Sequence, residues 1–124
     1  MLPHNATAVI ARNEVWTGKA ASEPYECGWA REAIVFLRAL DTPRGIGRTK
    51  ARIEISPDGI RWVPSGTTLA LPARRDQITL ARLAHFGNWL RVAVDLPRGA
   101  SIKVLVRGSG TNRFTNQERA TRQR

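Results

Sequence analysis

The stretch ISPDGIRWV, residues 55–63, decides the fold of this 124-residue chain. Its centre, Pro57-Asp58-Gly59, is typical of a tight turn: proline presets φ, aspartate suits the next position, and glycine accepts a positive φ. Ahead of the turn, apolar and polar residues alternate over residues 51–56, as they do in a half-buried strand. The stretch therefore predicts a three-residue hairpin with a bulge, after which residues 60–64 pair back antiparallel.

Strand signals recur on both sides of this hairpin. Residues 31–40 form a nearly continuous apolar run, which predicts a central strand buried on both faces, with a short helix as the alternative. Residues 67–71 predict a short strand, and residues 77–84 suit either a strand or an amphipathic helix. Regular alternation follows over residues 88–95 and 101–107. The predicted core consists of the inward positions Ile53, Ile55, Leu90, Val92, Val94, Ile102, Val104 and Val106.

Strands about eight to twelve residues apart, separated by proline and glycine, predict an all-β fold. We expect a single antiparallel β-sandwich or jelly-roll-like domain over residues 1–107, in which residues 1–27 are less clearly patterned and supply edge strands or an N-terminal arm. Residues 42–47 predict a flexible loop. Residues 108–124 begin with GSG, which is typical of a linker, and carry four arginines against one glutamate. They predict an extended basic C-terminal arm.

Composition and charge narrow the functional classes. The chain carries 20 basic and 10 acidic residues, a net charge of +10, which favours association with a polyanion or an acidic protein surface. No apolar run approaches the roughly 20 residues of a membrane span. No export signal precedes the domain, so we expect an assembled particle or otherwise the cytoplasm. The single cysteine, Cys27, excludes an internal disulfide and predicts a buried or half-buried thiol.

The sequence offers little for catalysis. His4 and His85 are isolated, and no metal-binding or nucleophile motif surrounds them. A sugar-cleaving carboxylate pair is the one enzymatic alternative, but surface carboxylates that balance arginine are far commoner. Its candidates are Glu14, Glu23, Glu26 and Glu32. Residues 45–47, Gly-Ile-Gly, lack the third glycine of a dinucleotide loop. We therefore expect no enzymatic activity, no cofactor and no metal.

The tryptophans allow two interpretations. The four tryptophans form either a stacking platform for sugars or unpaired bases, or packing and subunit contacts. They are Trp16, Trp29, Trp62 and Trp89, the last two with Arg61 and Arg91 beside them. Packing or interface is the favoured interpretation. The alternation places Trp89 on the face opposite the core, so it should be exposed unless something covers it.

The chain resembles small β-sandwich modules that recur in bacterial and phage structural proteins. These modules carry a strand, an S-x-DG-x-x-W hairpin and a further strand in which an arginine follows a large apolar residue. The resemblance covers roughly residues 31–107. The matching residues are Ser56, Asp58, Gly59, Trp62, Leu90 and Arg91. It implies a non-catalytic jelly-roll or sandwich with a structural, surface or virion role, and it carries over no active-site residue.

Three functions remain open. The first is a self-assembling structural protein, a virion or particle subunit of shell or decoration type, whose termini contact neighbouring subunits. The second is nucleic-acid binding or packaging through the basic arm. The third is a carbohydrate-binding module that uses exposed tryptophans. We favour the first, with a homo-oligomer or other structural subunits as partners, nucleic acid as a further candidate partner, and no membrane. The candidate subunit or phosphate contacts of the arm are Arg113, Phe114, Arg119, Arg122 and Arg124.

Overall fold

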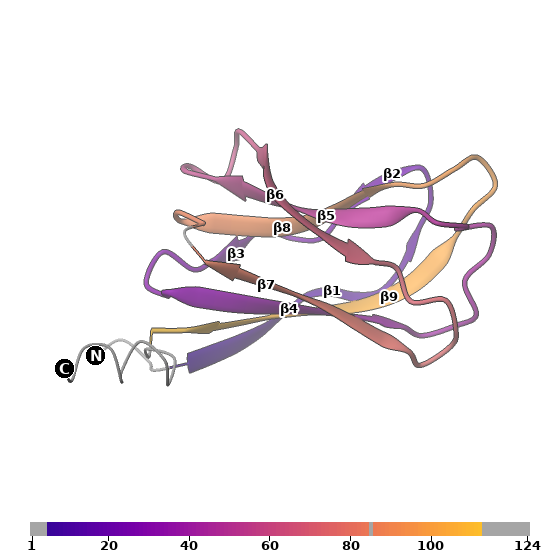
Figure 1. Cartoon of the computed structure of the whole chain (residues 1–124), viewed down its shortest axis with the longest axis horizontal. Coiled ribbons are helices and arrows are strands. Elements are labelled where there is room, and N and C mark those ends of the chain that lie inside the picture. Colours follow the sequence, from indigo (N-terminus) through magenta and orange to yellow (C-terminus); the bar gives the residue numbers. More distant parts are fainter. Residues whose placement is uncertain (1–4, 85, 113–124) are drawn as a thin grey trace.

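The structure, a computed structural model, describes residues 5–84 and 86–112, which fold into two antiparallel sheets packed face to face (Figure 1). No helix occurs in these residues, so the strand prediction holds for 31–40 and 77–84. The described strands are β1 (Asn5–Trp16), β2 (Lys19–Ala21), β3 (Tyr25–Glu26), β4 (Glu32–Ala39), β5 (Lys50–Ser56), β6 (Val63–Ala70), β7 (Ile78–Ala84), β8 (Trp89–Asp95) and β9 (Ile102–Thr111).

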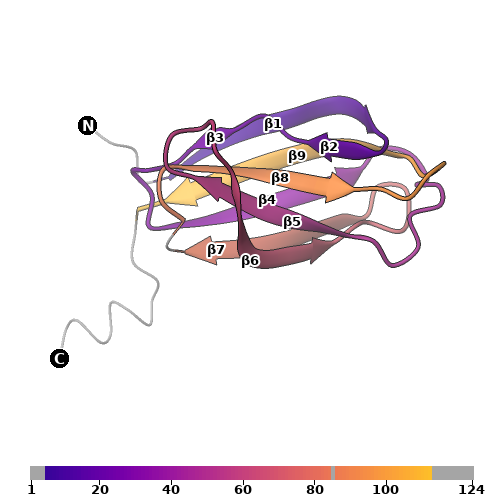
Figure 2. The same ribbon diagram turned by 90° about the horizontal axis from the view of Figure 1, so that it is seen from above.

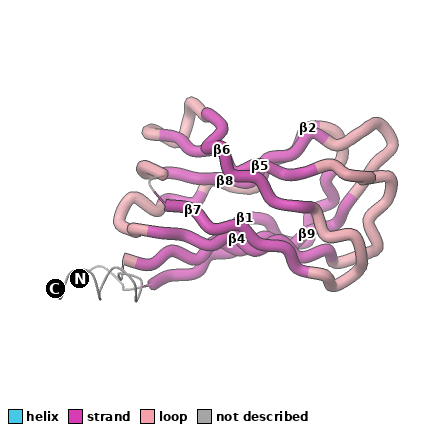
Figure 3. The backbone as a smooth tube through the Cα atoms, in the orientation of Figure 1, coloured by secondary structure: helices cyan, strands magenta, loops and turns pink. Residues whose placement is uncertain are grey.

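The strand order is that of a jelly roll. The first sheet has the order β1-β9-β4-β7, and the second has β2-β8-β5-β6, with β3 also paired to β8 (Figures 2 and 3). β2 and β3 both pair with β8 and count as two halves of one interrupted strand. The other pairs are then nested inside one another: β1 pairs with β9, β4 with β7 and β5 with β6. This nesting of antiparallel pairs in two sheets is the eight-stranded jelly roll. The predicted fold class is confirmed.

The core lies between the sheets and is built by alternation. The inward residues of β8 and β9 are buried as predicted, with Leu90 and Val106 both 0% exposed. Ile55 is only partly buried, although it packs against this core. The prediction that β4 is buried on both faces is wrong: its residues alternate between buried and half-buried. The apolar side chains Ile34 and Phe36 therefore lie on the outer face of the first sheet, away from the core.

The predicted hairpin exists, but its connection is longer than three residues. β5 ends at Ser56 and pairing resumes when Ile55 meets Val63, so the connection is residues 57–62. Gly59 has a φ of 76°, the positive value predicted for it. The prediction that pairing resumes at residue 60 is wrong, because residues 60–62 lie in the connection. Residues 63–64 and most of the predicted segment 67–71 belong to one strand, β6, whose register with β5 shifts beyond Arg52.

The last strand extends past the predicted domain boundary at residue 107. β9 continues to Thr111 and pairs on one side with β1 and on the other with β4. Gly108 and Gly110 are therefore sheet residues and not a linker. A side chain at Gly108 would lie 2.7 Å from Cδ2 of Tyr25, which packs from β3 onto this strand. The remainder of the predicted arm, 113–124, lies outside the described residues.

The predicted edge strands at the N-terminus are parts of β1, which forms one edge of the first sheet. The predicted flexible loop at 42–47 is anchored to the body of the domain. Ile46 is buried at 8% exposure, and the backbone groups of Arg44 and Ser101 exchange two hydrogen bonds of 2.9 Å. This loop is therefore fixed against the connection between β8 and β9.

Candidate interaction surfaces

A chain of charged and aromatic side chains crosses the outer face of the second sheet. The guanidinium of Arg91 lies 4.4 Å from the centre of the Trp62 ring, in cation–π geometry. Arg91 also donates to Oε1 of Glu54 at 2.7 and 2.8 Å. The other carboxylate oxygen of Glu54 accepts from Arg52 at 2.9 Å, and Arg52 reaches Asp95 at 3.1 Å. Glu54 is the acid shared by both arginines.

The neighbouring part of the same face is covered by Ser56 and the connection at residues 57–62, which together we call the SPDG loop. Ser56 Oγ accepts from the backbone N–H groups of Asp58 and Gly59, at 3.2 and 2.8 Å. Asp58 Oδ1 accepts from the N–H groups of Arg61 and Ile60, both at 2.9 Å. These backbone hydrogen bonds lower the pKa of Asp58 to about 2. The Asp58 carboxylate is therefore part of the loop's structure.

This loop explains where the predicted stacking residues lie. The Trp89 ring packs against Gly59, where an added side-chain carbon would meet it at 3.3 Å. The chain's own loop therefore covers Trp89, and Arg91 covers Trp62. Arg61 is exposed and pairs with Asp58 at 3.0 Å. All four tryptophans lie in the described residues, and none is exposed, which favours packing over an open stacking platform.

Glu54 should make the fold sensitive to acid. Burial by itself would raise its pKa, but hydrogen bonds from Arg52 and Arg91 outweigh burial and hold the pKa below the ordinary 4.5. A lowered folded-state pKa means that the stabilisation is full above the unfolded value and is lost as pH falls through the folded value. We therefore expect the urea concentration at the midpoint of unfolding to decrease when the pH is lowered below about 4.5.

The Glu54→Gln variant provides the comparison for this prediction. At pH 7 it should lose about 1 to 3 kcal/mol, because glutamine cannot form the charge-assisted hydrogen bonds. Its unfolding free energy should then fall less between pH 5 and pH 3 than that of the wild type. Parallel pH profiles of the two proteins would contradict this role of Glu54.

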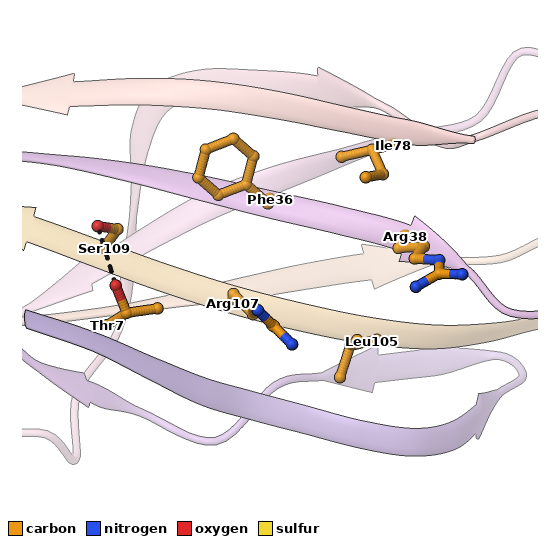
Figure 4. Close-up of a pocket in the computed structure, with 7 residues that line it drawn as sticks. All are labelled: Thr7, Phe36, Arg38, Ile78, Leu105, Arg107 and Ser109. Atoms are coloured by element: carbon orange, nitrogen blue, oxygen red, sulfur yellow. Dashed lines mark hydrogen bonds between the residues drawn. The ribbon is translucent and has the colours of Figure 1, made fainter. Parts of the chain in front are cut away.

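The outer face of the first sheet has a different character. A shallow depression of about 310 Å³ crosses its strands, and Figure 4 shows the side chains around it. The lining residues are Thr7, Phe36, Arg38, Ile78, Leu105, Arg107 and Ser109. Ile78 is 56% exposed, and Leu80, on the same strand, is 44% exposed. Apolar side chains thus lie in the open beside arginines.

Sequence reasoning missed this apolar face, although part of the signal was present. Phe36 and Leu105 occupy the alternate positions to the core residues of their strands, so an outward direction was readable for both. The ambiguity between strand and helix hid the direction of Ile78 and Leu80. Their proximity depends on the strand order, which places β7, β4 and β9 side by side.

Three of the residues considered for chemistry, Cys27, Glu14 and Glu26, are engaged in packing or in local hydrogen bonds. The Cys27 thiol is fully buried, and burial raises its pKa to about 12, so it stays protonated at neutral pH. Glu14 accepts from the indole N–H of Trp16 at 3.3 Å, and Glu26 accepts from a backbone N–H at 3.3 Å. Within residues 5–84 and 86–112, no group of three potential metal ligands occurs.

Several predicted residues lie outside the described part of the chain. They are His4, His85, Arg113, Phe114, Arg119, Arg122 and Arg124. Within the described part, no helix has the length and hydrophobicity needed to cross a bilayer.

Comparisons with known proteins show the fold. No protein-family model matches the chain, and no curated protein matches it in sequence. Among solved structures, the chain is similar to the crystal structure of the SPBc2 prophage-derived protein YomS, with a TM-score of 0.58 and 11% sequence identity. The likeness covers 89% of this chain and 95% of the YomS chain. It therefore extends over nearly the whole sandwich.

Proposed function

We propose that this chain is a non-enzymatic structural subunit of a phage-related particle, and that it associates with further copies of itself. The observation that carries the proposal is the exposed apolar face of the first sheet. Phe36 and Leu105 are half-buried there, and Ile78 and Leu80 are exposed. An apolar centre beside arginines is the usual anatomy of a protein–protein interface.

The charges on this face favour another copy of the chain as the occupant. Arg38 and Arg107 lie there together with two acids, Glu32 on the outward side of β4 and Asp76, which bonds Arg38 at 2.8 Å. A surface that carries both signs can meet a copy of itself across a two-fold axis, with unlike charges opposed. β7 is also an edge strand, and exposed apolar edge strands tend to pair with another chain unless they are covered.

The architecture supports the phage assignment. Jelly rolls are common in viral capsid proteins, and the similar YomS chain is described as prophage-derived. The sequence resemblance to phage structural modules points in the same direction. A structural role also requires no catalytic group, and the Glu54 cluster and Asp58 already serve in packing and loop hydrogen bonds.

The test is the mass of the protein in solution. Size-exclusion chromatography with light scattering should give a mass above the 13.8 kDa of one chain. The double variant Ile78→Thr, Leu80→Thr should return to the monomer mass, because it removes exposed apolar area while keeping good strand formers.

A matched control removes two exposed apolar residues elsewhere. Ile60 is 77% and Val63 is 54% exposed, at the SPDG loop of the other sheet. Ile60→Thr with Val63→Thr should leave the oligomer intact. A wild type that remains monomeric at high concentration, or a control that dissociates as fully as the face variant, would refute the proposed interface.

A further inference from the structure

One end of the sandwich gathers four connections between strands. They are the residues after β1, the β4–β5 loop, the β6–β7 loop and the β8–β9 loop, at 17–18, 40–49, 71–77 and 96–101. Figure 1 places them at the end opposite the start of β1 and the close of β9. We call these four connections and the strand residues next to them the loop end.

The loop end is strongly basic. Its carboxylates are Asp41, Asp76 and Asp95, and the last two already bond Arg38 and Arg52. Apart from Arg38 and Arg52, the basic residues are exposed except Lys103, which is half-buried, and none of them makes an ion pair within the described residues. These basic residues are Lys19, Arg44, Arg48, Lys50, Arg74, Arg75, Arg98 and Lys103.

Backbone hydrogen bonds hold three of the loops together. The β4–β5 loop is tied to the β8–β9 loop through Arg44 and Ser101, and the N–H of Leu40 donates to Lys103 at 2.8 Å. On the other side, the N–H of Asp76 donates to the carbonyl of Ala39 at 2.7 Å. The cations therefore project from a platform whose backbone positions are fixed by neighbouring strands.

A hollow in this platform has the donors that an anion needs. It measures about 360 Å³ and is lined in part by Arg44, Lys103, Thr42 and Ser101. A guanidinium, an ammonium and two hydroxyl groups are typical ligands of a phosphate oxygen. Asp41 also lines the hollow, so an anion there would have to be held by the cations against one carboxylate.

The chemistry of the loop end suits a nucleic acid better than a protein. Protein interfaces are depleted in lysine and rely on buried apolar anchors, whereas all three lysines of this chain lie here. Beside these loops, the exposed large hydrophobic residues are Val15, at 64%, and Ile78, which belongs to the apolar face. Many exposed cations with few apolar anchors are typical of a surface that contacts a phosphate backbone.

We propose that the loop end binds the phosphate backbone of nucleic acid without base specificity. This goes beyond a structural role and places the contact on the folded domain, at the end opposite the close of β9. No large aromatic side chain projects from these four connections, which contain no Trp, Tyr or Phe, so stacking on unpaired bases is not part of the proposal.

The test measures the salt dependence of DNA binding by the full chain. Fluorescence anisotropy with a short labelled duplex is followed between about 50 and 200 mM NaCl, where the slope of log affinity against log salt counts phosphate contacts. Arg74→Gln with Arg98→Gln should reduce this slope by about 2, one for each contact removed. Arg12→Gln with Arg82→Gln removes the same charge from exposed strand positions and should leave the slope unchanged.

Two further arms separate the alternatives. Arg74→Gln with Arg98→Gln should reduce the salt slope equally in a protein that already carries Arg119→Gln and Arg122→Gln, because the loop end acts independently of the C-terminal residues. Polyglutamate of similar length should bind more weakly than the duplex. The proposal fails if the control variant lowers the slope equally, if the drop disappears in the Arg119/Arg122 background, or if polyglutamate binds as tightly as DNA.

Discussion

Truncating Leu90 to alanine is expected to lower the free energy of unfolding by about 3 to 5 kcal/mol. Leu90 is fully buried in β8, where it pairs with Tyr25 on one side and Ile55 on the other. Truncation leaves a cavity between two sheets whose backbones are fixed by their ladders, so the walls can collapse only partly. Urea denaturation followed by tryptophan fluorescence measures the loss.

Leu80→Ala is the control for this substitution. The same atoms are removed from a side chain that is 44% exposed on the outer face, so the loss should stay below about 1 kcal/mol. Both variants are compared at a dilution where light scattering gives the monomer mass. Equal losses would mean that Leu90 does not face the core and that the register of β8 is wrong by one residue.

Replacing Gly108 with valine is expected to have the next largest effect, a loss of about 2 to 3 kcal/mol or failure to fold. A Cβ atom at this position would lie 2.7 Å from Cδ2 of Tyr25, whose ring is held by a 3.0 Å hydrogen bond from its hydroxyl to the carbonyl of Ala6. The ring is therefore fixed at both ends and cannot move aside cheaply. Thermal unfolding measures the change.

Two comparisons make the Gly108 result specific. Ser109→Val places the same side chain on the opposite, outward face of the strand and should cost little. Gly108→Ala should be less destabilising when Tyr25 is also alanine, because the clash then has no partner. If Gly108→Ala cost the same with and without the tyrosine ring, the packing of Tyr25 on β9 would be disproved.

The strands were predictable where a local pattern determines them. The alternation around Leu90 and Val104 identifies the inward face from a few neighbouring residues, because period two leaves only one choice. The same holds for the positive φ of Gly59, which depends on the turn chemistry beside it.

Features that depend on distant partners were not predictable. Gly108 and Gly110 are typical of a linker when the sequence is considered alone. Only the fold shows their close neighbours, which are Tyr25 at Gly108 and Ala30 and Trp29 at Gly110. The prediction that β4 is buried on both faces was wrong because an apolar run does not show whether a second layer covers the outer face of the strand. The loop end required the full topology, because its cations come from four separate connections.

The position of β9 between β1 and β4 has a consequence for synthesis of the protein. A nascent chain that ends before residue 102 has both neighbours of this strand but not the strand, so each presents an unsatisfied backbone edge. Insertion of β9 pairs it with β1, from which it is separated by most of the chain. This step is slow because the entropy of closing so long a loop is lost before the stabilising contacts form. The protein should therefore complete its fold only after β9 has left the ribosome, and until then these two unpaired edges are where chaperones would bind.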